Sequence, residues 1–195
     1  MTPSRIESLA LISRQFPADP VVLTCGATCR EMAAVDRRDN HYYIVDSMEI
    51  VTPVVLGLSL GMIGQSGRKA LGVEGDGGIL TNLNALTTVG YLQPDNFLLI
   101  VLDNESYAST GGQYTFSSKL DLASIASKCG LTTWQATDLA SLHQALAEAG
   151  ETPGPGFVHM KIAPGNAQVP LLLDDPVTMG DQFHRWLSDS MPVDD

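Results

Sequence analysis

The chain has 195 residues, of which 44% are hydrophobic and 17% are charged, so it is large enough for one domain and too apolar to be disordered. Its 22 acidic and 11 basic residues give a formal charge of −11, which argues against nucleic acid and anionic membranes as partners. The three cysteines form no CxxC pair and predict neither a disulfide framework nor a structural zinc site.

Neither terminus nor interior carries a recognisable targeting or membrane segment. The polar N-terminus lacks the basic and then apolar pattern of a signal peptide. The longest apolar stretch, residues 50–64, is too short to cross a bilayer and is typical of a buried helix. We therefore expect a cytoplasmic protein.

Short apolar runs alternate along the chain with segments of helical spacing. Strands are predicted at residues 21–25, 42–45, 70–73, 97–102, 131–135 and 157–162. Helices are predicted at residues 30–37, 51–64, 80–91, 122–129, 139–149 and 174–187, with Thr28, Asp121 and Asp138 as candidate N-caps. This alternation predicts a doubly wound α/β fold with a mostly parallel, six-stranded sheet and helices on both faces. Residues 1–190 then form a single domain, and residues 191–195 an acidic tail.

Two polar segments follow strands that are consecutive in this pattern. Gly75-Asp76-Gly77-Gly78 comes after one strand and leads into a helix, and Asn104-Glu105-Ser106 comes after the next. Because ligands bind beyond the carboxyl ends of parallel strands, both segments are expected at one edge of the sheet. Glycines let a phosphate approach the backbone, and Asp, Asn and carbonyl oxygens suit Mg²⁺.

Each of these segments has an ordinary interpretation when it is taken alone. Asp-Gly pairs are common in turns, and Asn104-Glu105-Ser106 also matches a glycosylation sequon. The four histidines show no metal-ligand spacing, and packing in a strand or at the surface accounts for them. The spacing of the two segments on consecutive strands is what favours a site.

This arrangement resembles the diphosphate-binding motif of thiamine diphosphate (TPP) enzymes. The run Tyr107-Ala108-Ser109-Thr110-Gly111-Gly112-Gln113 is similar to the beta subunit of sulfopyruvate decarboxylases and to the matching half of phosphonopyruvate decarboxylases. The resemblance extends from the first strand to the final helix, and it implies a pyrophosphate-binding domain that needs Mg²⁺.

The resemblance implies a role for each matching residue. Asp76, Asn104 and the Ser106 carbonyl would hold Mg²⁺. The expected cofactor-binding residues are Thr28, Asp46, Ser47, Met48, Gly75, Gly77, Gly78, Ile79, Asn104, Ser106 and Tyr107. The expected catalytic residues are Met48, Tyr107, Thr110 and Gln113. Each role has an ordinary alternative. Thr28 could simply cap a helix, Met48 could fill the core, and Tyr107, Thr110 and Gln113 could belong to a solvated loop.

The loop at residues 46–49 departs from the pattern of the family. The Asp46 carbonyl would accept a hydrogen bond from the aminopyrimidine, and Met48 would support the bent cofactor. The resembled enzymes read Gly-Ser-Met-Gly here, whereas this chain reads Asp46-Ser47-Met48-Glu49. Two added carboxylates disfavour a dianionic substrate unless a partner supplies cations, so a monoanionic or amine-bearing 2-oxo acid is a second hypothesis.

The function that the resemblance implies is a TPP- and Mg²⁺-dependent 2-oxo acid decarboxylase subunit. The chain has room for one α/β unit only, so a separate pyrimidine-domain (alpha) subunit is expected as its partner in a hetero-oligomer, to supply the glutamate that activates the cofactor. A carboligase subunit and a catalytically silent TPP-binding module stay open as alternatives.

Overall fold

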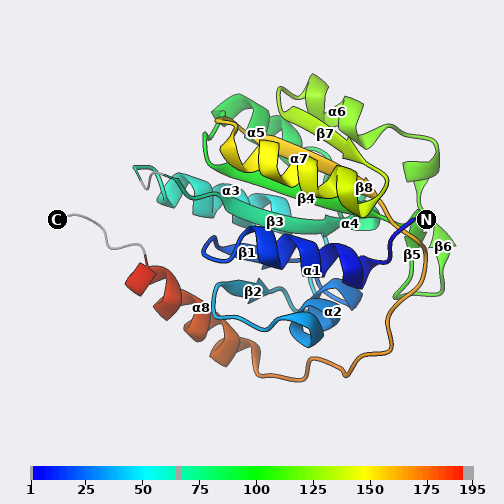
Figure 1. Cartoon of the computed structure of the whole chain (residues 1–195), viewed down its shortest axis with the longest axis horizontal. Helices are drawn as coiled ribbons and strands as arrows, with labels where there is room; N and C mark the ends of the chain where they lie inside the picture. The colour runs from blue at the N-terminus through cyan, green and yellow to red at the C-terminus, as the bar shows by residue number, and fades with distance from the viewer. Residues whose placement is uncertain (1, 65–66, 191–195) are drawn as a thin grey trace.

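The computed structural model describes residues 2–64 and 67–190 and is built on one six-stranded sheet (Figure 1). The strand order is β2-β1-β3-β4-β8-β7, and all neighbours are parallel. The strands are β1 (Val21–Leu23), β2 (His41–Tyr43), β3 (Ala70–Gly75), β4 (Phe97–Asp103), β7 (Thr132–Ala136) and β8 (Gly156–Lys161). The predicted doubly wound fold and its six strands are confirmed.

Helices cover both faces of this sheet (Figure 1). One face carries α1 (Arg5–Gln15), α2 (Ala27–Val35) and α7 (Leu139–Glu151), and the other carries α3 (Val51–Gly61), α4 (Asp76–Thr81), α5 (Ala85–Leu92) and α6 (Leu122–Lys128). The last helix, α8 (Pro176–Ser190), packs beside the edge strand β2. Every residue of β4 is buried, because a central parallel strand has helices above and below it.

The helix α1 has no counterpart among the predicted elements. Its buried residues include Arg5, Ser8 and Ser13 beside Leu9 and Ile12. Because polar side chains occupy much of its inner face, the apolar periodicity that identifies an amphipathic helix is weak. The polar N-terminal sequence therefore gave no periodic signal from which α1 could be predicted.

Several helix boundaries differ from the sequence prediction. The segment 80–91 is two helices, α4 and α5, with a break at residues 82–84. The helix α2 begins at Ala27 with Gly26 as its N-cap, so the expectation that Thr28 caps a helix is wrong and Thr28 lies in the first turn. Asp121 and Asp138 do cap α6 and α7. Residues 191–195, predicted as a tail, lie outside the described residues.

A small antiparallel hairpin follows β4 and was not predicted. It pairs β5 (Ser106–Tyr107) with β6 (Gln113–Tyr114) and leads into a short 3-10 helix, η1 (Phe116–Ser118). Two-residue strands are too short to show an alternating pattern in sequence. The hairpin projects from the end of the sheet where the parallel strands finish (Figure 1).

The strand order reverses between β1 and β3. From β1 the chain moves outward to β2, and it then returns to add β3 on the other side of β1. The loops after β1 and β3 consequently leave in opposite directions and open a crevice, which is where doubly wound sheets bind ligands. Within the described residues, no helix combines the length and apolarity needed to span a membrane.

The buried His41 on β2 makes folding stability depend on pH. Burial lowers the pKa of His41 to about 4, whereas an unfolded histidine titrates near pH 6.5. The unfolded chain therefore binds more protons between these values, and stability is lost as the pH falls through them. Replacing His41 with Gln should remove about 2 kcal/mol of the decrease in unfolding free energy between pH 7 and pH 5, measured by urea titration.

A matched control for this substitution is His143→Gln. His143 is exposed on α7, so its replacement should leave the pH dependence of unfolding as it is in the unaltered chain. If His41→Gln gave the same pH profile as His143→Gln, the buried neutral state of His41 would be disproved.

Candidate cofactor and metal site

A cavity of about 410 Å³ lies at the switch point between β1 and β3. Its walls come from the segment after β1, the loop after β2, the glycine-rich turn into α4 and the loop after β4. We call it the switch-point cavity. The predicted site residues that line it are Thr28, Asp46, Met48, Gly75, Asp76, Gly77, Gly78, Asn104, Ser106, Tyr107 and Thr110.

Three predicted site residues do not line the switch-point cavity. Ser47 lies between two lining residues, the Ile79 side chain is 2% exposed in the hydrophobic core, and Gln113 is exposed on β6. Gln113 is linked to the cavity wall through Thr110, whose Oγ1 donates to Gln113 Oε1 at 3.1 Å. The roles expected of these three residues stay predictions.

The glycines of the turn into α4 lie under closely packed side chains. A Cβ on Gly77 would come within 2.5 Å of the Tyr107 ring, and one on Gly78 within 2.2 Å of Glu74 Oε1. A Cβ on Gly75 would meet nothing within 4 Å. Glycine is therefore required for packing at two positions, while the third leaves open space for a ligand beside the backbone.

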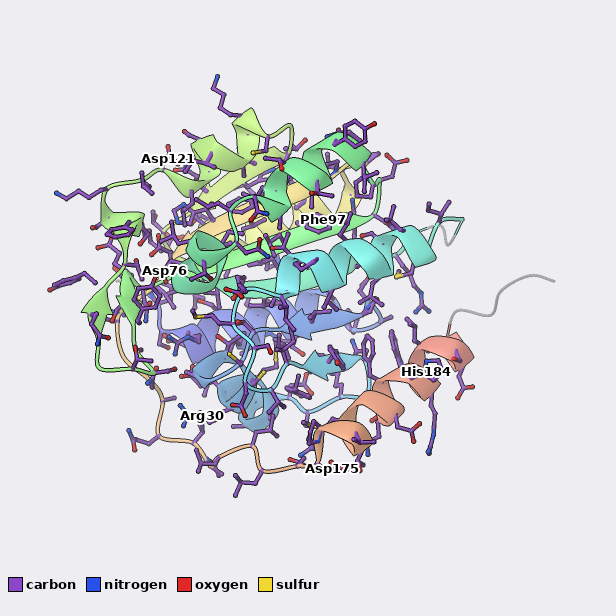
Figure 2. All side chains as sticks on the ribbon, turned by 180° about the vertical axis from the view of Figure 1, so that it is seen from behind. Arg30, Asp76, Phe97, Asp121, Asp175 and His184 are labelled. Atoms are coloured by element: carbon purple, nitrogen blue, oxygen red, sulfur yellow. The ribbon has the colours of Figure 1, made fainter. Side chains whose placement is uncertain are left out.

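Asp76 and Asn104 lie side by side, as the spacing of the two segments predicts. The β3–β4 register aligns Gly75 with Leu102, so the residues that follow each strand meet at the same edge. The Asn104 backbone N–H donates to Asp76 Oδ1 at 3.4 Å, and the Ser106 N–H donates to Asn104 Oδ1 at 3.2 Å. Figure 2 shows Asp76 at the start of α4.

Two hydroxyl groups from the segment after β6 hold the Asp76 carboxylate. Thr115 Oγ1 and Ser117 Oγ both donate to Asp76 Oδ2, the second at 3.2 Å. Burial raises the pKa of Asp76, and the hydrogen bond from Thr115 opposes this rise. A carboxylate whose ionised form is disfavoured by burial gains most from a nearby cation.

A second buried carboxylate, Asp103, organises the network behind Asp76. It accepts hydrogen bonds from Ser117 Oγ at 2.8 Å and the Glu105 N–H at 3.0 Å, and it lies 2.8 Å from His159 Nε2 and 2.7 Å from Lys161 Nζ. Burial opposes its ionisation, but the bonds from His159, Lys161 and Ser117 outweigh burial and hold the pKa of Asp103 well below its usual range. The single hydrogen of the Ser117 hydroxyl lies within reach of both carboxylates and is shared between them, so Ser117 links Asp103 to Asp76.

Oxygen atoms of the kind that Mg²⁺ prefers converge here. The Asp76 carboxylate, the Asn104 side chain and the Ser106 backbone are a donor set for a hard cation that completes its shell with phosphate oxygens and water. Asn104 Nδ2 is buried and has no hydrogen-bond partner among the described residues. A buried unpaired donor costs about 1–3 kcal/mol, so it marks a place that suits an anionic ligand. The residues fit a magnesium diphosphate.

The described residues contain no group of three or more His, Cys, Asp or Glu side chains that could hold a metal. The proposed donor set has one carboxylate, an amide and a carbonyl, and so is not a group of this kind. A site with fewer fixed negative charges also repels a diphosphate less.

The loop after β2 has the backbone of a glycine-containing loop. Asp46 and Glu49 have φ values of 56° and 76°, in the left-handed region that disfavours side chains. Asn82 Nδ2 donates to the Glu49 carbonyl at 3.0 Å and ties the loop to the end of α4. Met48 lies between Asp46 and Glu49, is 40% exposed and lines the switch-point cavity. An exposed methionine at a cavity suits the predicted support for a bound cofactor.

Sequence reasoning missed several residues that build the site. Glu74, Asp103, Thr115 and Ser117 are all buried, and burial raises the pKa of Glu74 to about 7. Glu74 and Asp103 stand next to the recognised segments, so their positions at strand ends could have identified them. Thr115 and Ser117 follow an unpredicted hairpin, and His159 was expected only to pack in its strand.

Comparison with known proteins shows the family to which this fold and sequence belong. Residues 25–160 match the family described as thiamine pyrophosphate enzyme, C-terminal TPP binding domain, and the chain belongs to this family. It is 33% identical over 168 residues to sulfopyruvate decarboxylase subunit beta of Methanothermobacter thermautotrophicus, covering 86% of each chain. It is 42% identical over 166 residues to phosphonopyruvate decarboxylase of Streptomyces viridochromogenes, covering 84% of this chain and 41% of that protein.

A solved structure supports the fold assignment. Benzoylformate decarboxylase from Polynucleobacter necessarius superposes with a TM-score of 0.72 at 19% identity, over 85% of this chain and 34% of that one. The chain spans about two fifths of the length of the phosphonopyruvate decarboxylases that it matches.

Removing the Asp76 carboxylate should abolish metal-dependent cofactor binding. We expect Asp76→Ala to weaken Mg²⁺-dependent TPP binding by about 100-fold or more, since the buried charge that faces the cation is lost. Isothermal titration of TPP with and without Mg²⁺ measures this affinity. Asp39→Ala, at an exposed turn residue, is the matched control and should change nothing; equal affinity in both variants would refute the metal assignment.

Substitutions at two glycines of the turn should have different effects, one on packing and the other on ligand binding. Gly78→Ala should lower the melting temperature, because its methyl group overlaps Glu74. Gly75→Ala should leave the melting temperature unchanged and weaken TPP binding, since its methyl group enters the open space. Thermal unfolding and TPP titration of both variants test this contrast. The opposite pattern would show that the space at Gly75 is not used by the cofactor.

Proposed function

We propose that this chain is the pyrophosphate-binding subunit of a TPP- and Mg²⁺-dependent 2-oxo acid decarboxylase. The observation that carries the proposal is the contact between Asp76 and Asn104 at the carboxyl ends of neighbouring strands, beside a glycine turn with open space. The sulfopyruvate decarboxylase beta subunits and phosphonopyruvate decarboxylases among its relatives support this reaction class.

The residues of this chain bind and orient the cofactor. Asp76, Asn104 and the Ser106 carbonyl would hold Mg²⁺, and the backbone amides of Gly77 and Gly78 would bind the diphosphate. When bound, TPP supplies a nucleophilic carbon and an electron sink for decarboxylation of a 2-oxo acid. The protein's own contribution is a fixed cofactor geometry and a site from which water is excluded.

The loop residues set the position of the reacting end of the cofactor. Met48 would support the bound cofactor, and the Asp46 carbonyl would accept a hydrogen bond from its aminopyrimidine. Tyr107 covers Gly77 and closes the wall on the other side. Thr110 lines the same cavity, where its hydroxyl can donate to a substrate carboxylate.

A separate pyrimidine-domain subunit completes the active site in this proposal. Exposed apolar side chains lie on segments that adjoin the walls of the switch-point cavity. Val45 directly precedes the lining residue Asp46 and is 43% exposed, and Tyr114 and Phe116, on and after β6, are 85% and 72% exposed. Exposed apolar side chains gathered near a site are typical of an interface. A relative with the same length coverage is named a beta subunit, which supports a hetero-oligomer, and we place the complex in the cytoplasm.

Reconstitution tests the proposed function. The chain is co-expressed with a candidate pyrimidine-domain subunit encoded beside it, and CO₂ release from a panel of 2-oxo acids is measured with TPP and Mg²⁺. We expect turnover that requires both subunits and gives an aldehyde product. Asp76→Ala should eliminate this turnover. An acyloin product would indicate a carboligase instead, and TPP binding without turnover of any 2-oxo acid would indicate a silent binding module.

A further inference from the structure

A second cavity adjoins the switch-point cavity. It also has a volume of about 410 Å³, and the two cavities share Cys25, Asp46, Ala108 and Ser109 as wall residues. Because its distinguishing feature is the side chain of Arg30 on α2 (labelled in Figure 2), we call it the Arg30 cavity. A ligand extending from the cofactor past Ser109 would enter it.

The outer wall of the Arg30 cavity is a segment held at both ends. Residues 166 and 171–173 form this wall, and they belong to a stretch without helix or strand between β8 and α8. Near its start, the Ala167 N–H donates to Glu31 Oε1 at 3.0 Å. Near its end, Asp174 forms a two-bond ion pair with Arg37, at 2.7 and 3.1 Å. Both anchors lie on or directly after α2, so the segment spans Arg30.

The two cavities differ in the charge of the side chains that line them. The switch-point cavity is lined by the carboxylates of Asp46, Glu74 and Asp76. Its one lining cation, Arg5, is 7% exposed and is already paired with Glu31 at 3.0 Å. An additional anion in the switch-point cavity would therefore find no unpaired cationic side chain among the described residues that line it.

Arg30, unlike Arg5, has no ion-pair partner among the described residues. Arg30 is half-buried in the first turn of α2 and lines only the Arg30 cavity. Within residues 2–64 and 67–190 it forms neither a hydrogen bond nor an ion pair through its guanidinium. Apolar neighbours such as Ile44 and Leu171 lower the local dielectric and strengthen its attraction for an anion.

We propose that Arg30 is the specificity-determining residue that binds a second, distal anionic group of the 2-oxo acid. This inference rests on the proposed function. The names of the relatives already contain a 2-oxo acid with a phosphonate or sulfonate group beyond the carbonyl, and the inference adds the residue that would bind this group. The 2-oxo acid end lies over the cofactor, and the distal group passes Ser109 to the guanidinium. A planar guanidinium binds such tetrahedral oxyanions through two hydrogen bonds at once.

Asp46 sits at the junction of the two cavities and sharpens this selection. Asp46 lines both cavities. Its negative charge therefore disfavours an anion that stops at the junction, whereas an anion that reaches Arg30 is compensated by the guanidinium. The acidic loop and Arg30 together predict selection by the length of the substrate as well as by its charge.

The experiment compares Arg30→Gln and Arg30→Lys with the unaltered chain in the assembled complex. The ratio of kcat/KM for phosphonopyruvate to kcat/KM for pyruvate is measured for each. We expect Arg30→Gln to lower this ratio by about 10-fold to 100-fold through phosphonopyruvate alone, since a charge-assisted pair is lost, and Arg30→Lys to recover part of it. Arg14→Gln, at an exposed arginine of α1, should keep the ratio of the unaltered chain.

A binding measurement keeps the inference separate from the proposed reaction. Phosphonoacetate, which cannot be decarboxylated in this way, should raise the melting temperature of the unaltered protein more than acetate does, and Arg30→Gln should remove the difference. If no 2-oxo acid turns over, the proposed function fails while this measurement still decides the role of Arg30. An unchanged ratio in Arg30→Gln, a preference for pyruvate or an amine-bearing 2-oxo acid in the unaltered complex, or equal binding of both acetates would overturn the assignment.

Discussion

The structure around the site depends on the burial of a carboxylate at the end of a parallel strand. Asp76 is 1% exposed, so its negative charge must be compensated by what surrounds it. Two hydroxyl groups and a backbone amide donate hydrogen bonds to it, and none of them carries a positive charge. In the proposed function a cation compensates that charge, and metal binding would then be part of the local fold.

The sheet topology decides which residues can share this site. Reversal of strand order between β1 and β3 places Thr28 and the glycine turn on opposite sides of one crevice, although more than forty residues separate them in the chain. The order β3-β4 then adds Asn104 at the next strand end. Cofactor binding therefore follows from the order of strands and needs no long-range loop to reach across the molecule.

The sequence allowed all six strands and the pairing of Asp76 with Asn104 to be predicted, because near-continuous apolar runs and glycine turns have local signals. It did not allow the prediction of α1, whose inner face includes Arg5 and two serines. Arg5 and Ser13 are buried with partners elsewhere in the chain, Glu31 and Asp36. The same holds for Ser117, whose role depends on two carboxylates in other elements. Contacts of this kind are properties of the fold and have no periodicity to detect.

The segment from Tyr114 to Ser117 alternates between outward and inward side chains. Tyr114 and Phe116 are exposed, whereas Thr115 and Ser117 are buried against Asp76. Four consecutive residues thus connect the surface to the carboxylate, with no intervening layer of side chains. In the proposed complex, a subunit that packs on the two aromatic rings would also restrain the two hydroxyls. Assembly and metal affinity would then share one coupling free energy, equal in both directions.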